Sequence, residues 1–90
     1  MTEDIISNVS SIYIACGYTD MRKSIDGLAA LVQYNYNLDP FSKSLFLFCG
    51  RSTNKMKALI WQGDGFLLIY KRLEDGRFMY RTAKKYKRSK

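Results

Sequence analysis

The sequence predicts a single α+β domain, in which one amphipathic helix packs on a mostly antiparallel sheet or a barrel-like meander in the order β-α-β-β-β-β. The first observation is the length, because 90 residues can build one modest hydrophobic core. The second is a helical apolar period before Pro40, and the third is a series of strand-like apolar runs after it. We expect a flexible arm over residues 1–10, the domain over 11–80 and a basic tail over 81–90.

The first strand is predicted near residues 12–16, where β-branched and aromatic side chains predominate. Gly17 and Tyr18 interrupt this strand. Thr19 or Asp20 is then a candidate N-cap, because its side-chain oxygen can accept a hydrogen bond from an amide of the first helical turn.

The helix is predicted from about Asp20 to Tyr34. Met21, Ile25, Leu28 and Val32 recur at helical spacing, so we expect them to pack on one face of the sheet. The helix should end before Pro40, because proline disfavours helical dihedrals in the preceding residue.

Four strand-like segments follow, at residues 45–49, 55–62, 66–73 and 77–80. Residues 63–65, Gly-Asp-Gly, predict a tight hairpin because glycine readily adopts positive φ. Residues 74–76 predict a second tight turn. The segment 66–73 is apolar on both faces, whereas one helix can cover only one face of a sheet. The sheet should therefore close into a barrel, or its second face should meet a partner or a second copy of the chain.

Several classes of function are excluded or disfavoured by composition. Histidine is absent, which removes the usual acid–base group and the commonest metal ligand. Cys16 and Cys49 lack a metal-ligand spacing and are expected to be reduced thiols of a cytoplasmic protein. The carboxylates fall at predicted turns and helix ends, so we expect no enzyme, no metal and no cofactor. No apolar run is long enough to span a membrane.

Charge is distributed unevenly along the chain. Residues 1–50 carry three Lys or Arg against five Asp or Glu, a net of −2, whereas residues 51–90 carry twelve against three, a net of +9. Such a basic half favours polyanionic partners, and DNA phosphates are the simplest. The alternative is that these cations only keep an aromatic-rich sheet soluble. The candidate nucleic-acid-binding residues are Arg51, Lys55, Lys57, Lys71, Arg72, Arg77, Arg81, Lys84, Lys85, Lys87 and Arg88.

The segment Asp20, Met21, Arg22 and Lys23 contains a local conflict. Asp20 suits the positive end of a helix dipole, whereas cations at positions 22 and 23 do not. Such a conflict can mark a functional site. The alternative is an ion pair between Arg22 and Asp26, one helical turn apart.

These residues resemble a known family. Residues 17–32, GYTDMRKSIDGLAALV, are similar to a signature of TnpB, the small accessory protein of insertion-sequence-66 family transposons, which is distinct from the RNA-guided nucleases of the same name. Residues 39–42 (DPFS), 45–48 (LFLF), Arg51, 57–61 (KALIW), 63–65, 70–74 (YKRLE) and 76–78 (GRF) match further elements in order.

The resemblance covers about residues 12–80 and implies an accessory role beside the transposase of the same element. Relatives usually continue through a proline and an apolar helical stretch, where this chain has its basic tail. Such a departure is what a truncated or frameshifted copy would show. Two readings follow: a transposition factor that contacts the DNA backbone, the transposase or both, and a protein-interaction module without DNA contact.

Overall fold

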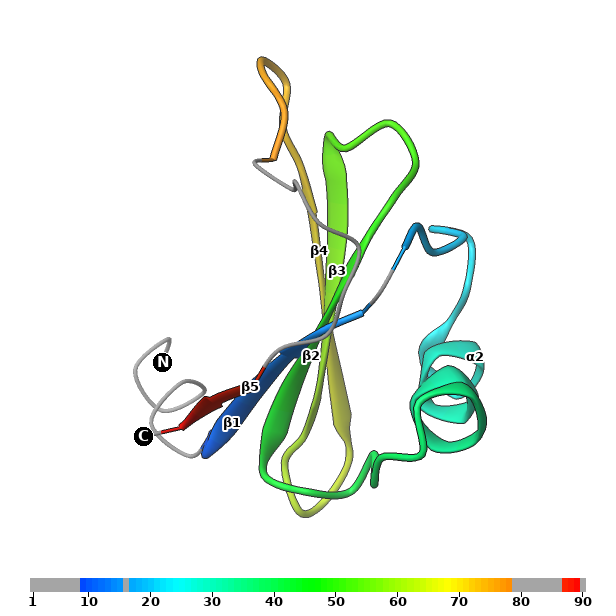
Figure 1. Cartoon of the computed structure of the whole chain (residues 1–90), viewed down its shortest axis with the longest axis vertical. Helices are drawn as coiled ribbons and strands as arrows, with labels where there is room; N and C mark the ends of the chain where they lie inside the picture. Colours follow the sequence, from blue (N-terminus) through cyan, green and yellow to red (C-terminus); the bar gives the residue numbers. More distant parts are fainter. Residues whose placement is uncertain (1–8, 16, 79–86, 90) are drawn as a thin grey trace.

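The computed structural model describes residues 9–15, 17–78 and 87–89 of the chain. A short helix lies on one side of an open, twisted sheet (Figure 1). The α+β prediction is confirmed, and the barrel-like alternative is wrong because β4 and β5 form two separate edges. The elements are β1 (Ser11–Ile14), α2 (Ile25–Ala30), η1 (Leu31–Asn35), β2 (Ser44–Cys49), β3 (Lys55–Trp61), β4 (Phe66–Arg72) and β5 (Lys87–Ser89).

The strands are arranged in the order β4-β3-β2-β1-β5. β2, β3 and β4 form the predicted antiparallel meander, and β5 is antiparallel to β1. β1 and β2 are parallel, with Ile12 opposite Leu45 and Ile14 opposite Leu47. A parallel pair needs a long crossover connection, and the chain segment that contains α2 and η1 supplies it. The predicted Gly-Asp-Gly hairpin joins β3 to β4, with Gly63 at a φ of 91°.

The helix begins later than predicted, because α2 starts at Ile25 with Ser24 as its N-cap residue. The expected cap at Thr19 or Asp20 is therefore wrong. Residues 20–23 form a turn instead, in which the Lys23 amide donates to the Asp20 carbonyl at 3.1 Å. An Asp side chain can accept from an amide two residues ahead in a turn as well as from a helical amide, so the sequence pattern fits both structures.

The helix ends close to the predicted position. Its last turn widens into the π-helical segment η1, and Asn37 then adopts a left-handed conformation with φ of 55°. This conformation commonly follows a helix and is tolerated by asparagine. Asp39 then accepts a hydrogen bond from the Phe41 amide at 2.9 Å, which sets the turn into β2.

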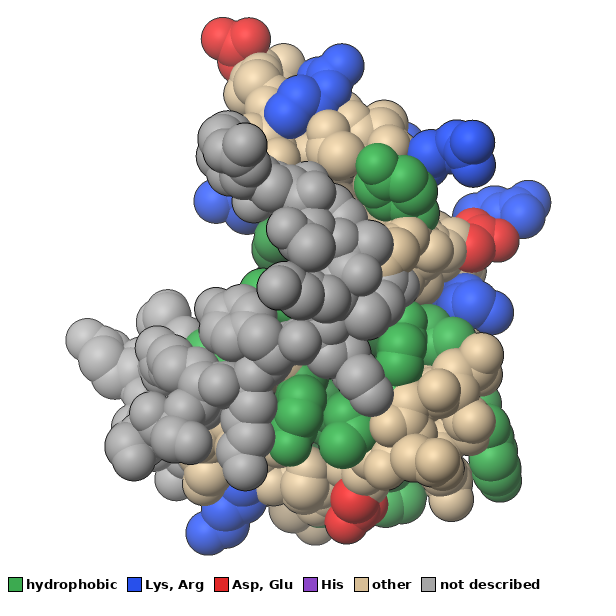
Figure 2. Space-filling view, viewed as in Figure 1, with side chains coloured by type: hydrophobic (Ala, Val, Ile, Leu, Met, Phe, Trp, Pro, Cys, Tyr) green, Lys and Arg blue, Asp and Glu red, His purple; other side chains and the backbone are tan. Residues whose placement is uncertain are grey.

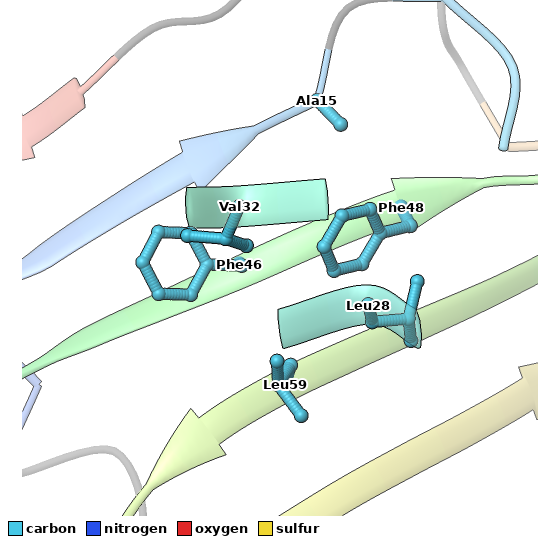
Figure 3. Close-up of a cluster of buried hydrophobic side chains, with 6 residues drawn as sticks. All are labelled: Ala15, Leu28, Val32, Phe46, Phe48 and Leu59. Atoms are coloured by element: carbon cyan, nitrogen blue, oxygen red, sulfur yellow. The ribbon is translucent and has the colours of Figure 1, made fainter. Parts of the chain in front are cut away.

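The main core lies between the helix and the sheet. Leu28 and Val32 point from the helical segment toward Phe46, Phe48 and Leu59 of β2 and β3 (Figure 3). Met21 and Ile25 are partly buried against the same cluster, so the predicted helix face is confirmed. α2 and η1, the helical segments of the described residues, include no candidate for crossing a membrane.

The opposite sheet face carries a second apolar cluster. Val9, Leu45, Ala58 and Ile60 are buried there, with Ile12, Leu47 and Leu67 partly buried beside them. Val9, which lies in the segment expected to be a flexible arm, packs in this cluster, and the Ser10 amide donates to the Lys43 carbonyl at 2.7 Å. The folded domain therefore begins at least two residues earlier than predicted.

The end of the chain also differs from the prediction. Arg77 and Phe78 are not in a strand, whereas residues 79 and 80 of the predicted fourth segment lie outside the described residues. Part of the basic tail does form a strand, because β5 pairs with β1 through Lys87 opposite Tyr13. Backbone hydrogen bonds alone can add a strand to a sheet edge. β5 therefore forms without the apolar period that would have predicted it from the sequence.

A candidate nucleic-acid interface at one end of the sheet

Three connections that are distant in the sequence meet at one end of the sheet. β1 and β2 both end there, β3 begins there, and β4 ends there. The connections are residues 15–24, 50–54 and 73–78, and we call this the loop end. Hydrogen bonds hold them in place: the Thr19 amide donates at 2.8 Å to the carbonyl of Cys49, the last residue of β2, and the Phe78 amide donates to the Thr53 carbonyl at 2.7 Å.

Most of the described cations lie at or next to the loop end. Residues 9–78 contain nine Lys or Arg, and all but Lys43 belong to these connections or to the adjoining ends of β3 and β4, so eight of nine gather there. Figure 2 shows the corresponding concentration of blue side chains in the upper half of the molecule. The cations at this end are Arg22, Lys23, Arg51, Lys55, Lys57, Lys71, Arg72 and Arg77, and the carboxylates are Asp20, Asp26, Glu74 and Asp75.

The first ion pair of this end joins Asp20 and Arg22. The guanidinium donates from Nε to Oδ1 at 3.0 Å and from Nη2 to Oδ2 at 2.9 Å, and the Arg22 amide donates to Oδ1 at 2.9 Å. Hydrogen bonds from Arg22 lower the Asp20 pKa to about 2. The Arg22 side chain is 91% exposed. The predicted alternative, an ion pair between Arg22 and Asp26, is wrong because the partner is Asp20.

The neighbouring residues of this segment have structural contacts. Met21 covers Gly50, where an added Cβ would lie 2.7 Å from the Met21 Cγ. The Lys23 carbonyl accepts a hydrogen bond from Lys57 Nζ at 2.9 Å. The turn before α2 is therefore fastened to the start of the connection after β2 by Met21 and to β3 by the Lys23 backbone, while the Arg22 side chain faces solvent.

The remaining cations of the loop end differ in whether their side chains are engaged in a hydrogen bond or an ion pair. Lys57 is engaged by the Lys23 carbonyl and lies 5.8 Å from the centroid of the Tyr70 ring. Arg72 is paired with Glu74, its Nη2 lying 2.7 Å from Oε2, and this contact raises the Arg72 pKa. Among the described residues, Arg51, Lys55 and Lys71 have no side-chain hydrogen bond or ion pair. The Lys23 side chain likewise has no hydrogen bond or ion pair within the described part of the chain, so these four cations of the loop end are available to a polyanion.

The tail residues of the predicted set are placed only in part. Arg81, Lys84 and Lys85 lie outside the described residues, whereas Lys87 and Arg88 belong to β5. Within the described part of the chain, no cluster of three or more His, Cys, Asp or Glu could hold a metal ion. Cys49 is a free, buried thiol whose pKa is raised by burial, and Cys16 lies outside the described residues.

Sequence reasoning missed the position of Tyr70. Alternation along β4 places it on the same face as Phe66 and Leu68, and these two residues pack against the main core. In the structure, Tyr70 is 51% exposed, because the last four residues of β4 all lie beyond the buried part of the sheet. The polar Lys71 and Arg72 directly after it were the available signal.

Comparisons with known proteins agree with the resemblance noted above. A family model described as "IS66 Orf2 like protein" matches residues 10–89. The chain is 42% identical over 72 residues to the uncharacterized protein y4hO of Sinorhizobium fredii, covering 80% of this chain and 63% of that protein. It is 32% identical over 73 residues to the uncharacterized protein y4jC of the same organism, covering 81% and 62%. The chain thus spans less than two thirds of either relative. No solved structure matches it.

Proposed function

Because this chain belongs to the family of IS66 Orf2-like proteins, we propose that it is a non-catalytic accessory protein of DNA transposition that contacts the DNA backbone through its loop end. The observation that carries the proposal is that eight of the nine Lys and Arg in residues 9–78 gather at that end. Phosphates attract Lys and Arg whatever the base sequence, because each contact releases condensed counterions. The cytoplasm, where DNA is accessible in a bacterial cell, is the expected compartment.

Binding at the loop end should tolerate any DNA sequence. α2 is six residues long and packs Leu28 into the core, so it cannot also enter a major groove as a recognition helix. Phosphate contacts position a protein on DNA without reading bases. We therefore expect a Kd on the order of 10⁻⁴–10⁻⁶ M at physiological salt.

A salt series with a labelled duplex tests the proposal by fluorescence anisotropy. Neutralising roughly three to six phosphates would give a log–log slope of about −3 to −5. Lys71→Gln should reduce that slope by about one, because it removes one phosphate contact. Lys43→Gln removes the same charge from the opposite end and should leave the slope unchanged. Charge substitutions are preferable to deletion of residues 81–90, since the deletion would also remove β5.

Two results would overturn the proposal that DNA contacts the loop end. One is a flat signal even at roughly 20 mM salt, where surface charges are least screened. The other is an equal loss of affinity in Lys43→Gln and Lys71→Gln, which would indicate a response to net charge and not to the loop end. Retention on the transposase of the same element, without retention on DNA, would instead support the protein-interaction reading.

A further inference from the structure

One face of the β3–β4 hairpin combines cations with an exposed aromatic ring. Lys57 lies opposite Tyr70 in the strand register, and Lys55 lies opposite Arg72. Directly opposite residues share a face, and Lys57 is also opposite Phe48 of the main core. These four side chains therefore continue the core-facing surface of the sheet beyond the helix. We call Lys55, Lys57, Tyr70 and Arg72 the hairpin platform.

The Tyr70 ring is the central feature of this platform. It is 51% exposed although it stands on the face that carries the core. The Lys57 ammonium lies 5.8 Å from the ring centroid, a distance at which a cation attracts an aromatic ring. Lys57 is itself held by the Lys23 carbonyl at 2.9 Å. The ring is thus a positioned aromatic surface that is open to solvent and surrounded by positive charge.

We propose that the hairpin platform binds single-stranded DNA, with an unpaired base stacked on Tyr70 and adjacent phosphates bound by Lys55 and Arg72. The inference rests on the proposed function and specifies its substrate. An exposed ring beside a basic track is the arrangement that binds single strands without sequence preference, because every base has a stacking face. Arg72 can exchange Glu74 for a phosphate, since that ion pair is exposed and such pairs are weak.

A duplex would use this surface less well than a single strand. Bases in a duplex are stacked on each other and present only their edges in the grooves. The Tyr70 ring could then contribute nothing beyond what the cations contribute. β4 is also an edge strand of the sheet, so a single strand can pass along the ring without meeting another strand of the described sheet.

The experiment compares Tyr70→Leu with Tyr70→Phe in the full-length chain, by anisotropy with a labelled single strand and a labelled duplex of equal length. Removal of one stacking ring should weaken single-strand binding roughly 5- to 150-fold. Tyr70→Phe keeps the ring and should retain the affinity of the unmodified chain. Tyr34→Leu is the matched control, because Tyr34 is 76% exposed in η1 and lies outside the platform. Duplex binding should change less than about two-fold in all three variants.

A single strand that keeps its phosphates but carries abasic sites separates stacking from charge. The unmodified chain should bind this strand as weakly as Tyr70→Leu binds the normal strand, and Tyr70→Leu should cause no further loss. Equal effects of Tyr70→Leu on normal and abasic strands would overturn the inference while leaving the proposed DNA contact intact. Absence of binding to any DNA at low salt would overturn both.

Discussion

Asp20 organises the turn before α2 through its carboxylate. One oxygen accepts the Arg22 amide and the guanidinium Nε, and the other accepts Nη2. All of these hydrogen bonds are stronger to the charged carboxylate than to the neutral acid, so they disfavour its protonation. This local geometry, and not a helix dipole, explains an acidic residue at position 20.

The Asp20 pKa tests this arrangement. We expect a value of about 2, below the ordinary 3.8, and a return toward 3.8 in Arg22→Gln. Because the folded-state pKa is lowered, the stabilising contribution is present above pH 3.8 and is lost as the pH falls through about 2. NMR titration of the carboxyl carbon measures both values. Titration of Asp20 near 3.8 in the unmodified chain would contradict the ion pair.

Gly50 is the glycine whose small size matters most among those described. An added Cβ would lie 2.7 Å from the Met21 Cγ, closer than real Cβ atoms approach. Gly50→Ala should therefore displace Met21 and lower the free energy of unfolding by about 1–3 kcal/mol. Gly65→Ala is the control, because nothing lies within 4 Å of its added Cβ. Urea denaturation measures both, and Met21→Ala should restore part of the loss in the Gly50→Ala background.

At the scale of elements, the helical segment is held mainly by its buried side chains. α2 has six residues, too few for a helix to be stable by itself, and it has no side-chain N-cap hydrogen bond. Leu28 and Val32 fix it to β2 and β3 by burial in the main core. The sheet, in turn, needs this cover over Phe46 and Phe48.

Leu28→Ala measures this dependence. Leu28 is fully buried, so its truncation should lower the free energy of unfolding by about 2–5 kcal/mol, a large share of the stability of a small domain. Gln33→Ala is a control in the adjoining exposed surface of η1 and should change stability by less than about 0.5 kcal/mol. A similar small change for Leu28→Ala would show that the helix does not pack as described.

At the scale of the whole molecule, most of the positive charge of the described residues lies at one end of the sheet. The loop end carries eight Lys or Arg against four carboxylates. Lys43, Asp39 and Asp64 lie toward the opposite end of the sheet, which we call the hairpin end because residues 62–65 join β3 to β4 there. The hairpin end holds a group of aromatic rings instead, in which Trp61 contacts Phe41 and Phe66 with centroid separations of 5.0 and 4.9 Å. A polyanion should therefore approach the molecule from the loop end.

Removal of one carboxylate from each end tests whether DNA binds at the basic loop end. Glu74→Gln removes a negative charge from the loop end and frees Arg72 from its ion pair, so DNA binding should become several-fold tighter. Asp64→Asn removes an equal charge at the β3–β4 hairpin and should change affinity less than two-fold. Anisotropy at low salt compares the two variants. Equal tightening by both would show that only net charge governs binding.

Short-range patterns in the sequence determined much of this protein. Apolar spacing identified the face of the helix that carries Leu28 and Val32, and glycine identified the hairpin at Gly63. Both depend on residues within a few positions of each other, so sequence alone could reveal them. The ordered motifs also identified the family.

Long-range contacts decided the rest. The turn at Asp20 replaced a helical start because the Thr19 amide donates to the Cys49 carbonyl and Met21 rests on Gly50. Both contacts span about thirty residues. The parallel pairing of β1 with β2 carried that turn to the same end as residues 50–54 and 73–78. The exposure of Tyr70 depended on where the buried part of the sheet ends along β4. Local pattern sets which elements form, whereas pairing and packing between distant residues set which side chains share a surface.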